Sequence, residues 1–412
     1  MIGFRIAGQK SRSAPQKSIR LYFRSEYGTS SINYPFFPAR NYSDYKRIIL
    51  RSAFTYWWGR NTIFRDDIIQ TIVSHNNIDM DIQMSTPSLL FINGEYWGIH
   101  NIRERQDKYY ISSIHNIDKD QIDIINGNLS VEEGSAETFI ELIDFVELND
   151  LSVTSNYEHV KSFIDIENYI DYFIIETYFG NHDWPWNNMR MWRYQNPGAK
   201  WKWLLYDLDA TIGDIALNPF EYINNSTNIQ VLLFKKLLEN DEFKNLFIRR
   251  YVFHLQTTFN PDNINELLSQ FESSYSPEIS EHILRWSNPF DYESWLSSCD
   301  YFQEFIENRP YYMEEFLISY FDIINEIYDI YNKNIISIFP NPSTGNLTLK
   351  FDTNKDIQGN ITIFTSFGDI VYSGKLNNAI QQLNLNFLKS GVYLVQINSN
   401  IVQKTEKIII MK

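Results

Sequence analysis

The spacing of apolar residues predicts helices and one hairpin along most of the chain. Residues 60–73 and 165–179 carry apolar side chains at a spacing of three to four positions, so each is expected to form an amphipathic helix. Residues 88–102 are expected to form a β-hairpin, because an Asn-Gly pair near the centre supplies the two positive φ angles of a tight turn. Further amphipathic segments make residues 227–330 mostly helical in this interpretation.

Residues 17–23 alternate between polar and apolar side chains, which predicts a half-buried strand. Ser18, Arg20 and Tyr22 fall on its polar face. Two more strands are predicted over residues 189–206, with an Asn-Pro-Gly turn between them.

The last part of the chain has a different pattern. Polar and apolar residues alternate over five short runs separated by Gly, Pro and Ser, which is typical of a small antiparallel β-sandwich. We therefore place a domain boundary near residue 335, with a mixed domain over 1–335 and an all-β domain over 336–412. The predicted fold class is α+β.

Composition excludes several classes of protein. With 412 residues, 43% of them hydrophobic, the chain is long and apolar enough for two or three folded domains. Its one cysteine, Cys299, excludes a disulfide framework and a cysteine-based zinc site. No uncharged apolar run has the length of a membrane-spanning helix, so we expect no transmembrane segment.

Charge is distributed unevenly along the sequence. The formal net charge of −15 argues against broad nucleic-acid binding, because a polyanion would be repelled. Residues 1–51, however, contain ten basic and two acidic residues, whereas residues 52–337 contain 19 basic and 45 acidic ones. A basic strip that faces an acidic body would suit a phosphate anion and its divalent cation. Ordinary variation of surface charge is the alternative.

Candidate chemistry concentrates after the helix predicted at 165–179. Asp183 and Asn188 lie in the loop that follows it, and Asp207 and Asp209 follow the second of the two later strands. Carboxylate and amide oxygens are ligands that suit Mg²⁺. The order of helix, Asp-x4-Asn, hairpin and strand-end Asp is also that of the catalytic half of protein kinases. Taken alone, the first two residues also fit an ordinary turn, because Asp and Asn stabilise turns.

The stretch from Phe4 to Phe23, FRIAGQKSRSAPQKSIRLYF, resembles the signature of the spore coat protein H (CotH) kinase family. Four further landmarks of that family follow in order: the Arg65-Asp66 step, the segment Leu90–Gly98 followed by Glu104, the loop 181–188, and the segment Leu205–Asp209. Together the landmarks cover about residues 4–215.

This resemblance implies an atypical protein kinase-like fold that transfers phosphate from ATP to Ser or Thr of a protein, with Mg²⁺ or Mn²⁺. The protein substrate is unknown. Asp183 would be the catalytic base, and Asn188 and Asp207 would be metal ligands, with Asp209 close behind them.

The resemblance also implies residues that bind the nucleotide. Lys17, helped by Arg12, would contact the phosphates, and Glu104 would orient the nucleotide or pair with the lysine. The alternatives are that Lys17 and Arg12 form the solvated edge of a basic strand, and that Glu104 belongs to a surface ladder of ion pairs.

The sequence departs from the family signature at three places. Ala7 stands where the family has Arg, Gln16 replaces its first signature lysine, and Tyr206 replaces the Trp before the first metal Asp. A non-catalytic surface or envelope protein, used for adhesion or display, is therefore the first alternative. A carbohydrate-active enzyme with Asp207 and Asp209 as paired carboxylates is the second.

The motifs IFPNPSTGN, from Ile338, and LKSGVYLV, from Leu388, belong to a tail that resembles the type A C-terminal sorting domain of the type IX secretion system of Bacteroidetes. That resemblance implies export to the outer-membrane surface or the medium by the type IX machinery. The chain begins within a predicted strand and has no signal-peptide pattern. We therefore expect the natural N-terminus to lie upstream of Met1.

Five tryptophans lie in or beside the later strands: Trp184, Trp186, Trp192, Trp201 and Trp203. We expect them to pack in the core and across strands rather than to form a sugar-binding platform. His182 is expected to be structural.

Overall fold

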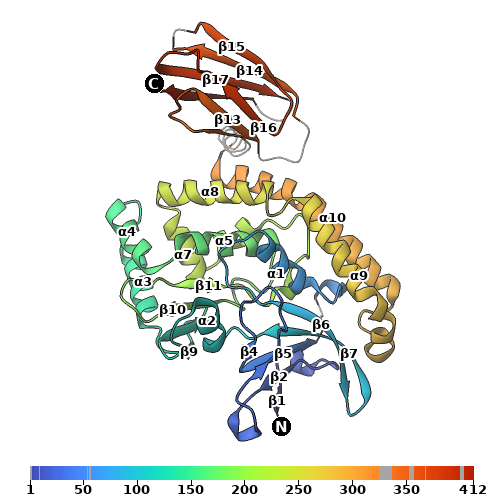
Figure 1. The fold of residues 1–412 in the computed structure, drawn as a ribbon. Helices are drawn as coiled ribbons and strands as arrows, with labels where there is room; N and C mark the ends of the chain where they lie inside the picture. The colour runs from blue at the N-terminus through green and yellow to red at the C-terminus, as the bar shows by residue number, and fades with distance from the viewer. Residues whose placement is uncertain are drawn as a thin grey trace. The chain divides into compact units, whose positions relative to one another are not determined.

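A computed structural model describes residues 2–8, 10–52, 54, 57–323, 336–351, 357–366, 368–399 and 403–412. The chain forms two compact units, Met1–Phe316 and Leu317–Lys412 (Figure 1). The boundary predicted near residue 335 lies outside the described residues.

The first unit begins with a five-stranded antiparallel sheet in the order β1-β2-β5-β7-β6. We call this sheet, with helix α1, the first lobe. A short hairpin, β3–β4, is inserted between β2 and β5, so β5 is the third strand of the sheet along the chain. The bounds are β1 Gly3–Ile6, β2 Ile19–Tyr22, β3 Ile32–Asn33, β4 Asp44–Tyr45, β5 Arg47–Ser52, α1 Arg65–His75, β6 Ser85–Ile92 and β7 Glu95–Glu104.

The predicted hairpin is confirmed at β6 and β7. Asn93 and Gly94 have φ angles of 53° and 83°, as the tight turn between two strands requires. The strand β2 lies within the segment that the alternation predicted, and the helix α1 overlaps the predicted segment 60–73 but continues to His75.

The two faces of this sheet have different partners. One face is apolar and packs against the segment between β2 and β5, where Phe23, Phe37 and Tyr45 form a buried cluster with Ile48 of β5. On the opposite face Arg103 of β7 contacts helix α1. The sheet therefore presents its polar face to the rest of the unit.

The second lobe is built around helix α5 and a four-stranded sheet in the order β11-β10-β8-β9. Every residue of α5 except the exposed Glu167 is buried, so this helix lies almost entirely within the second lobe. The side chain of Asn168 on α5 accepts from the backbone N–H of Trp203 on β11 at 2.6 Å, which fixes helix to sheet. The bounds are β8 Ile122–Asn126, β9 Val131–Glu133, α5 Ile166–Tyr178, β10 Arg190–Tyr194 and β11 Lys202–Leu204.

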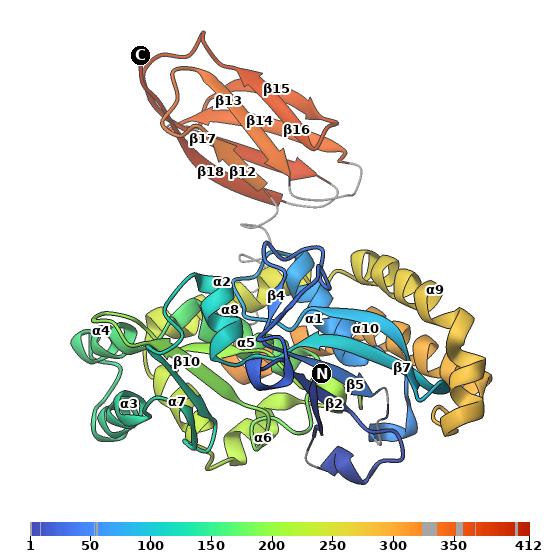
Figure 2. The same ribbon diagram turned by 60° about the horizontal axis from the view of Figure 1, so that its bottom comes forward.

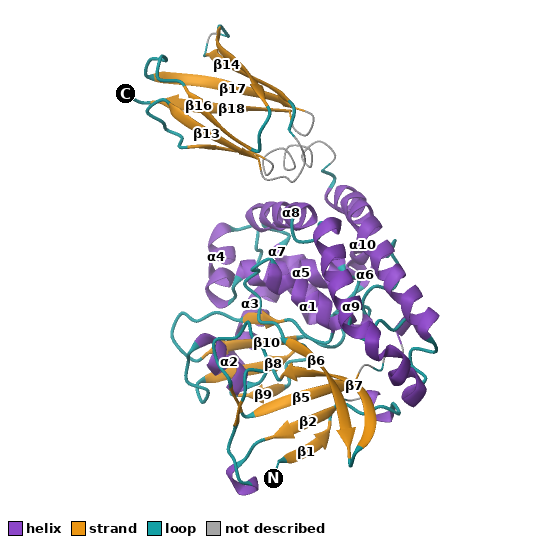
Figure 3. Cartoon of the chain, turned by 45° about the vertical axis from the view of Figure 1, so that its right-hand side comes forward, coloured by secondary structure: helices purple, strands orange, loops and turns teal. Residues whose placement is uncertain are grey.

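The other helices surround these two sheets. Figure 2 shows α3 and α4 at one end of the unit and α9 at the other, and Figure 3 shows α8 and α10 on the side away from the five-stranded sheet. Helix α9 is fixed to β7, because Trp286 donates to Trp97 O at 2.9 Å and His282 accepts from Ile99 N–H at 3.0 Å. The bounds are α2 Lys108–His115, α3 Glu137–Leu148, α4 Thr154–Phe163, α6 Pro219–Asn225, α7 Ile229–Leu237, α8 Asp241–Gln256, α9 Pro261–Trp286 and α10 Tyr292–Phe321.

The second unit contains two antiparallel sheets, β12-β13-β16 and β15-β14-β17-β18. Their inward side chains form one apolar core that includes Leu349, Ile361, Val395 and Ile408. The predicted all-β C-terminal region is confirmed. The bounds are β12 Ile336–Phe339, β13 Asn346–Phe351, β14 Gly359–Thr365, β15 Ile370–Leu376, β16 Ile380–Asn384, β17 Gly391–Ser399 and β18 Gln403–Ile410.

Arg309 of α10 fixes the C-terminal end of α5. Its buried guanidinium donates to the backbone oxygens of Thr177 and Tyr178 at 3.0 and 2.8 Å, and to those of Ile215 and Leu217, both at 2.7 Å. The last carbonyls of a helix have no partner within the helix, so this side chain supplies one. The end of α5 is also where the loop with Asp183 begins.

We expect Arg309→Met to lower the free energy of unfolding of the first unit by about 3 kcal/mol or more, because two buried and two partly buried carbonyls lose a charged donor. All ten tryptophans lie between Trp57 and Trp295, so tryptophan fluorescence during urea unfolding reports on this unit alone. Arg249→Met, at an exposed position of α8, is the matched control and should have little effect. An equal decrease in the free energy of unfolding in the two variants would contradict the role given to Arg309.

Candidate functional site

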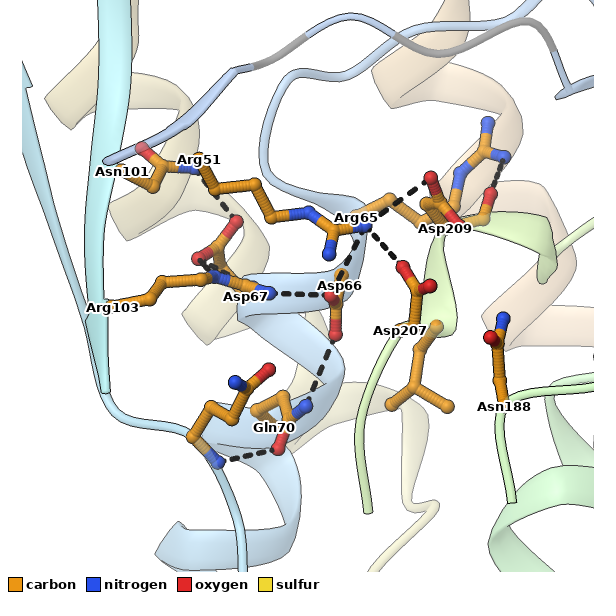
Figure 4. Close-up of polar contacts among 12 residues, drawn as sticks. Arg51, Arg65, Asp66, Asp67, Gln70, Asn101, Arg103, Asn188, Asp207 and Asp209 are labelled. Carbon is orange, nitrogen blue, oxygen red and sulfur yellow. Dashed lines mark hydrogen bonds and ion pairs between the residues drawn. The ribbon is translucent and has the colours of Figure 1, made fainter. Parts of the chain in front are cut away.

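The end of the β10–β11 hairpin brings two of the predicted metal ligands together. Asn188 precedes β10 and Asp207 follows β11, and the ladder pairs Arg190 with Leu204, so the two residues lie at the same end of the hairpin. Their φ angles are 57° and 61°, in the left-handed region that Asn and Asp adopt more readily than most residues. Figure 4 shows their side chains beside each other.

The loop that carries Asp183 is attached to both neighbouring segments. His182 N–H donates to Ala210 O at 3.0 Å, and the amide of Asn188 donates to Asp183 Oδ2 at 3.4 Å. At the start of the loop, Asn181 Oδ1 accepts from Asp183 N–H at 3.1 Å. Asp183 is therefore held beside the residues that follow β11.

Arg51 of β5 joins the first lobe to the second at this point. Its Nη2 forms an ion pair with Asp207 Oδ1 and lies 3.3 Å from Asp209 Oδ2 and 3.8 Å from Asp66 Oδ2 (Figure 4). Asp66 belongs to α1, and the other two carboxylates belong to the turn after β11. Sequence reasoning missed Arg51; its only signals are the basic N-terminal segment and the apolar strand residues just before it.

Two further side chains support the carboxylates of α1. Arg103 forms ion pairs with Asp66 at 2.5 Å and with Asp67 at 2.7 Å, and Gln70 Nε2 donates to Asp66 Oδ1 at 3.1 Å. Burial alone would raise the pKa of Asp66, but Arg103 and Arg51 hold it below its ordinary value. Asp66 therefore contributes a fixed negative charge to the site.

A third arginine, Arg65, supports the turn itself. Its Nη1 donates to the backbone oxygens of Asp209 at 2.9 Å and of Thr211 at 3.2 Å. The Arg65-Asp66 step thus has two separate tasks: the arginine holds the backbone of the turn, and the aspartate faces Arg51. This gives a physical reason for the two residues to be adjacent at the start of α1.

The face of the five-stranded sheet that carries Arg51 is basic. Arg5 is paired with Arg20 across β1 and β2, and Arg20 with Ile49 across β2 and β5. Directly paired residues lie on the same face, as do residues two positions apart on a strand, so all of them share the face of Arg51. Partial burial raises the pKa of Tyr22, but neighbouring arginines lower it below its ordinary value. The polar face predicted for residues 17–23 is this basic face.

Lys17 lies at the connection between β1 and β2. Its Nζ donates to Arg12 O at 2.7 Å and to Ala14 O at 2.5 Å, while the side chain of Arg12 is exposed. In protein kinases a loop of the first lobe covers the nucleotide phosphates. Lys17 supports the corresponding connection here, and its contact with phosphate stays a prediction.

Glu104 has partners of its own. Its carboxylate accepts from Arg40 Nε at 2.9 Å, from Met84 N–H at 2.9 Å and from Tyr42. The interpretation of Glu104 as part of a surface ladder is wrong, because the residue is 1% exposed. The structure does not bring Lys17 and Glu104 together, since each binds other groups.

A chain of hydrogen bonds nevertheless links Glu104 to the site. Gln83 Nε2 donates to Glu104 O at 2.9 Å, Gln83 N–H donates to Gln70 Oε1 at 3.0 Å, and Gln70 contacts Asp66. Glu104 thus helps to fix the end of β7, and this series of hydrogen bonds starts from there. Glu104 does not contact Arg51 in this arrangement.

The tryptophans behave as expected, with one exception. Trp184, Trp192, Trp201 and Trp203 are buried. Trp186 is 58% exposed and lies beside an open pocket of about 560 Å³ with Tyr222, so the expectation of core packing is wrong for this residue. The ring of His182 packs against Trp57 and Trp58, with centroid distances of 5.6 and 5.3 Å.

Two acidic side chains at the site have raised pKa values. Burial and then repulsion by Asp207 raise the pKa of Asp209 to about 7. Burial raises the pKa of Glu176, on α5, to about 8, and Asp66 and Asp207 add to the effect. Glu176 Oε2 accepts a hydrogen bond from the Asn181 amide at 2.8 Å. Because Asn181 begins the loop that carries Asp183, this buried carboxyl group with a raised pKa is attached to that loop.

Comparison with known families assigns both parts of the chain. The model of the CotH kinase protein family matches residues 4–313. The chain belongs to the CotH kinase protein family. A model of the secretion system C-terminal sorting domain matches residues 337–411. A search of curated proteins gives no match.

The predicted family, fold class and sorting domain are thereby confirmed. The sorting domain of this CotH protein indicates the type IX secretion machinery as a partner and a location at the outer surface or in the medium. None of the described helices is long and apolar enough to cross a membrane.

The donor groups of the CotH site fit a divalent metal ion. Carboxylate and amide oxygens of Asp207, Asp209 and Asn188 are hard ligands of the kind that Mg²⁺ takes. Within the described residues, no group of three or more His, Cys, Asp or Glu side chains is arranged around a single metal position. The guanidinium of Arg51 is the cation that the carboxylates surround instead.

We expect Glu176→Gln to change the pH dependence of stability. The wild-type native state keeps a proton up to about pH 8, whereas the unfolded carboxyl releases it near 4.5, so wild-type stability falls as pH rises between these values. Glutamine does not titrate. The free energy of unfolding of the variant relative to wild type should therefore rise across this window, by a few kcal/mol, and then level off.

The measurement is urea unfolding, followed by tryptophan fluorescence, at several pH values across that window. Glu147→Gln, at an exposed position of α3, is the control and should keep a constant difference from wild type. A Glu176→Gln curve that runs parallel to wild type would show that Glu176 is ionised in the native protein.

Proposed function

We propose that this CotH-family protein is an exported or surface-located kinase that transfers the γ-phosphate of ATP to a Ser or Thr hydroxyl of a protein, with Mg²⁺ or Mn²⁺. The observation that carries the proposal is that Asn188 and Asp207 lie at the same end of one hairpin. Asn188 donates to Asp183 there, and Asp207 pairs with a basic side chain, Arg51, from the third strand of the first lobe.

The position of Arg51 supports this proposal. In protein kinases the lysine that binds phosphate is on the third strand of the first lobe and pairs with an acid on the helix that follows. Arg51 is on the third strand here, and Asp66 is on the helix that follows. Guanidinium groups bind phosphate with two parallel hydrogen bonds, so the replacement of lysine by arginine keeps this chemistry.

The roles of the remaining residues follow from their positions. Asp207, Asp209 and Asn188 would hold the metal ion, which supplies charge neutralisation at the phosphates. Arg5 and Arg20, on the face that carries Arg51, would attract the polyphosphate. Asp183 would orient the acceptor hydroxyl and take its proton, because the Asn188 amide fixes its carboxylate beside the turn that carries Asp207.

We expect the full chain to transfer labelled phosphate from ATP to itself or to dephosphorylated casein in the presence of Mn²⁺ or Mg²⁺. Asp183→Asn should reduce the rate by about a hundredfold or more, because it removes the group that accepts the proton. Asp207→Asn should abolish metal-dependent transfer. Asp214→Asn, an exposed aspartate five residues beyond Asp209, is the matched control and should retain the wild-type rate.

A different result would favour the non-catalytic interpretation. If the protein transfers no phosphate and an ATP analogue does not bind in the presence of metal, the CotH fold serves adhesion or display at the cell surface instead. Transfer that persists in Asp183→Asn would contradict the role of that residue, although not the activity.

A further inference from the structure

A single nitrogen atom of Arg51 lies among three carboxylates. Nη2 forms the ion pair with Asp207 and is 3.3 Å from an oxygen of Asp209 and 3.8 Å from an oxygen of Asp66. The three acids come from two different segments and converge on one cation (Figure 4). One positively charged group thus neutralises carboxylates from both lobes.

The acids differ in how much they depend on Arg51. Asp66 is also bound by Arg103 and Gln70. For Asp207 and Asp209, Arg51 provides the side-chain ion pairs found in the described part of the chain. Both side chains are 30% exposed, so solvent and ions can reach them. The two acids that would hold a metal are thus the two that depend most on the arginine.

Arg51 and a divalent cation would compete for the same oxygens. Two positive charges at this separation repel each other, and the repulsion is strong where water is partly excluded. A metal ion can therefore enter only when the guanidinium leaves the carboxylates. The polar face around Arg51 carries further arginines, Arg5 and Arg20, so the displaced guanidinium needs an anion brought from outside.

We propose that Arg51 is an internal counter-cation that makes the site selective for metal together with a polyphosphate, over metal alone. While the site is empty, Arg51 neutralises Asp207 and Asp209. When a nucleotide enters, its phosphates take over the guanidinium, and the two carboxylates are released to the metal. The inference rests on the proposed function in one respect, that the anion is the phosphate chain of ATP.

This exchange couples the two ligands. If the phosphates increase the affinity for metal by some factor, the metal must increase the affinity for the nucleotide by the same factor. Arg51 is the origin of the coupling, so its removal should strengthen the binding of metal alone and weaken the coupling.

The test measures Mn²⁺ binding to the full chain from the electron paramagnetic resonance signal of free Mn²⁺, with and without the non-hydrolysable analogue AMP-PNP. In wild type, the analogue should tighten Mn²⁺ binding by about tenfold or more. Arg51→Gln should bind Mn²⁺ alone about tenfold more tightly than wild type, and AMP-PNP should increase the Mn²⁺ affinity of this variant little further. Arg51→Lys, which keeps the charge, should remain close to wild type.

Arg24→Gln is the matched control, because Arg24 is exposed and pairs with Glu26 away from these carboxylates. It removes the same charge and should leave Mn²⁺ binding unchanged. The proposal is overturned if Arg51→Gln binds Mn²⁺ alone no more tightly than wild type. It is overturned as well if Arg24→Gln increases the Mn²⁺ affinity as much as Arg51→Gln does. It is also overturned if AMP-PNP leaves the Mn²⁺ affinity of the wild type unchanged, a result that needs no variant to fold.

The outcome is separate from that of the kinase assay. A gain in Mn²⁺ affinity in Arg51→Gln supports the counter-cation even if the protein transfers no phosphate. Phosphate transfer without that gain supports the kinase and overturns the counter-cation.

Discussion

One guanidinium group determines how the two lobes of the CotH domain meet. Arg51 comes from the sheet of the first lobe, and its partners Asp207 and Asp209 come from the turn that ends the hairpin of the second. Burying like charges together is unfavourable, so the carboxylates of the turn and of α1 can lie close only with a cation between them. Arg103 pairs with Asp66 of α1, and Arg65 donates to the backbone of the turn at Asp209. The geometry of the site follows from this alternation of charge.

The local elements of the fold could be predicted from the sequence because their signals are short-range. The Asn-Gly pair at Asn93 favours the tight turn with two positive φ angles that joins two strands. The apolar residues of α5 repeat with the period of a helix. The strict alternation in the tail likewise identifies a sandwich. Asp183, Asn188 and Asp207 could be chosen as candidates from the sequence because they lie within 25 residues of each other on either side of one hairpin.

The rest of the site depends on contacts between residues far apart in the sequence. Arg51 is separated from Asp207 by 156 positions, and nothing in its neighbourhood distinguishes it from the other arginines of the basic segment. Glu104 was assigned to the nucleotide by resemblance, but its carboxylate is bound by Arg40 and Tyr42, which the β3–β4 insertion brings to it. The burial of neighbouring groups decides such pairings, and burial is set only once the lobes have packed.

The contact between Arg309 and the end of α5 also ties the loop with Asp183 to the C-terminal part of the first unit. Arg309 is on α10, the last helix before the sorting domain among the residues that the structure describes. The loop with Asp183 starts from the helix end that this arginine fixes. A protein shortened from its C-terminal end keeps this support only while the helix up to Arg309 is retained. A truncation a few turns into α10 would remove the side chain that holds the end of α5, and with it the loop that carries Asp183.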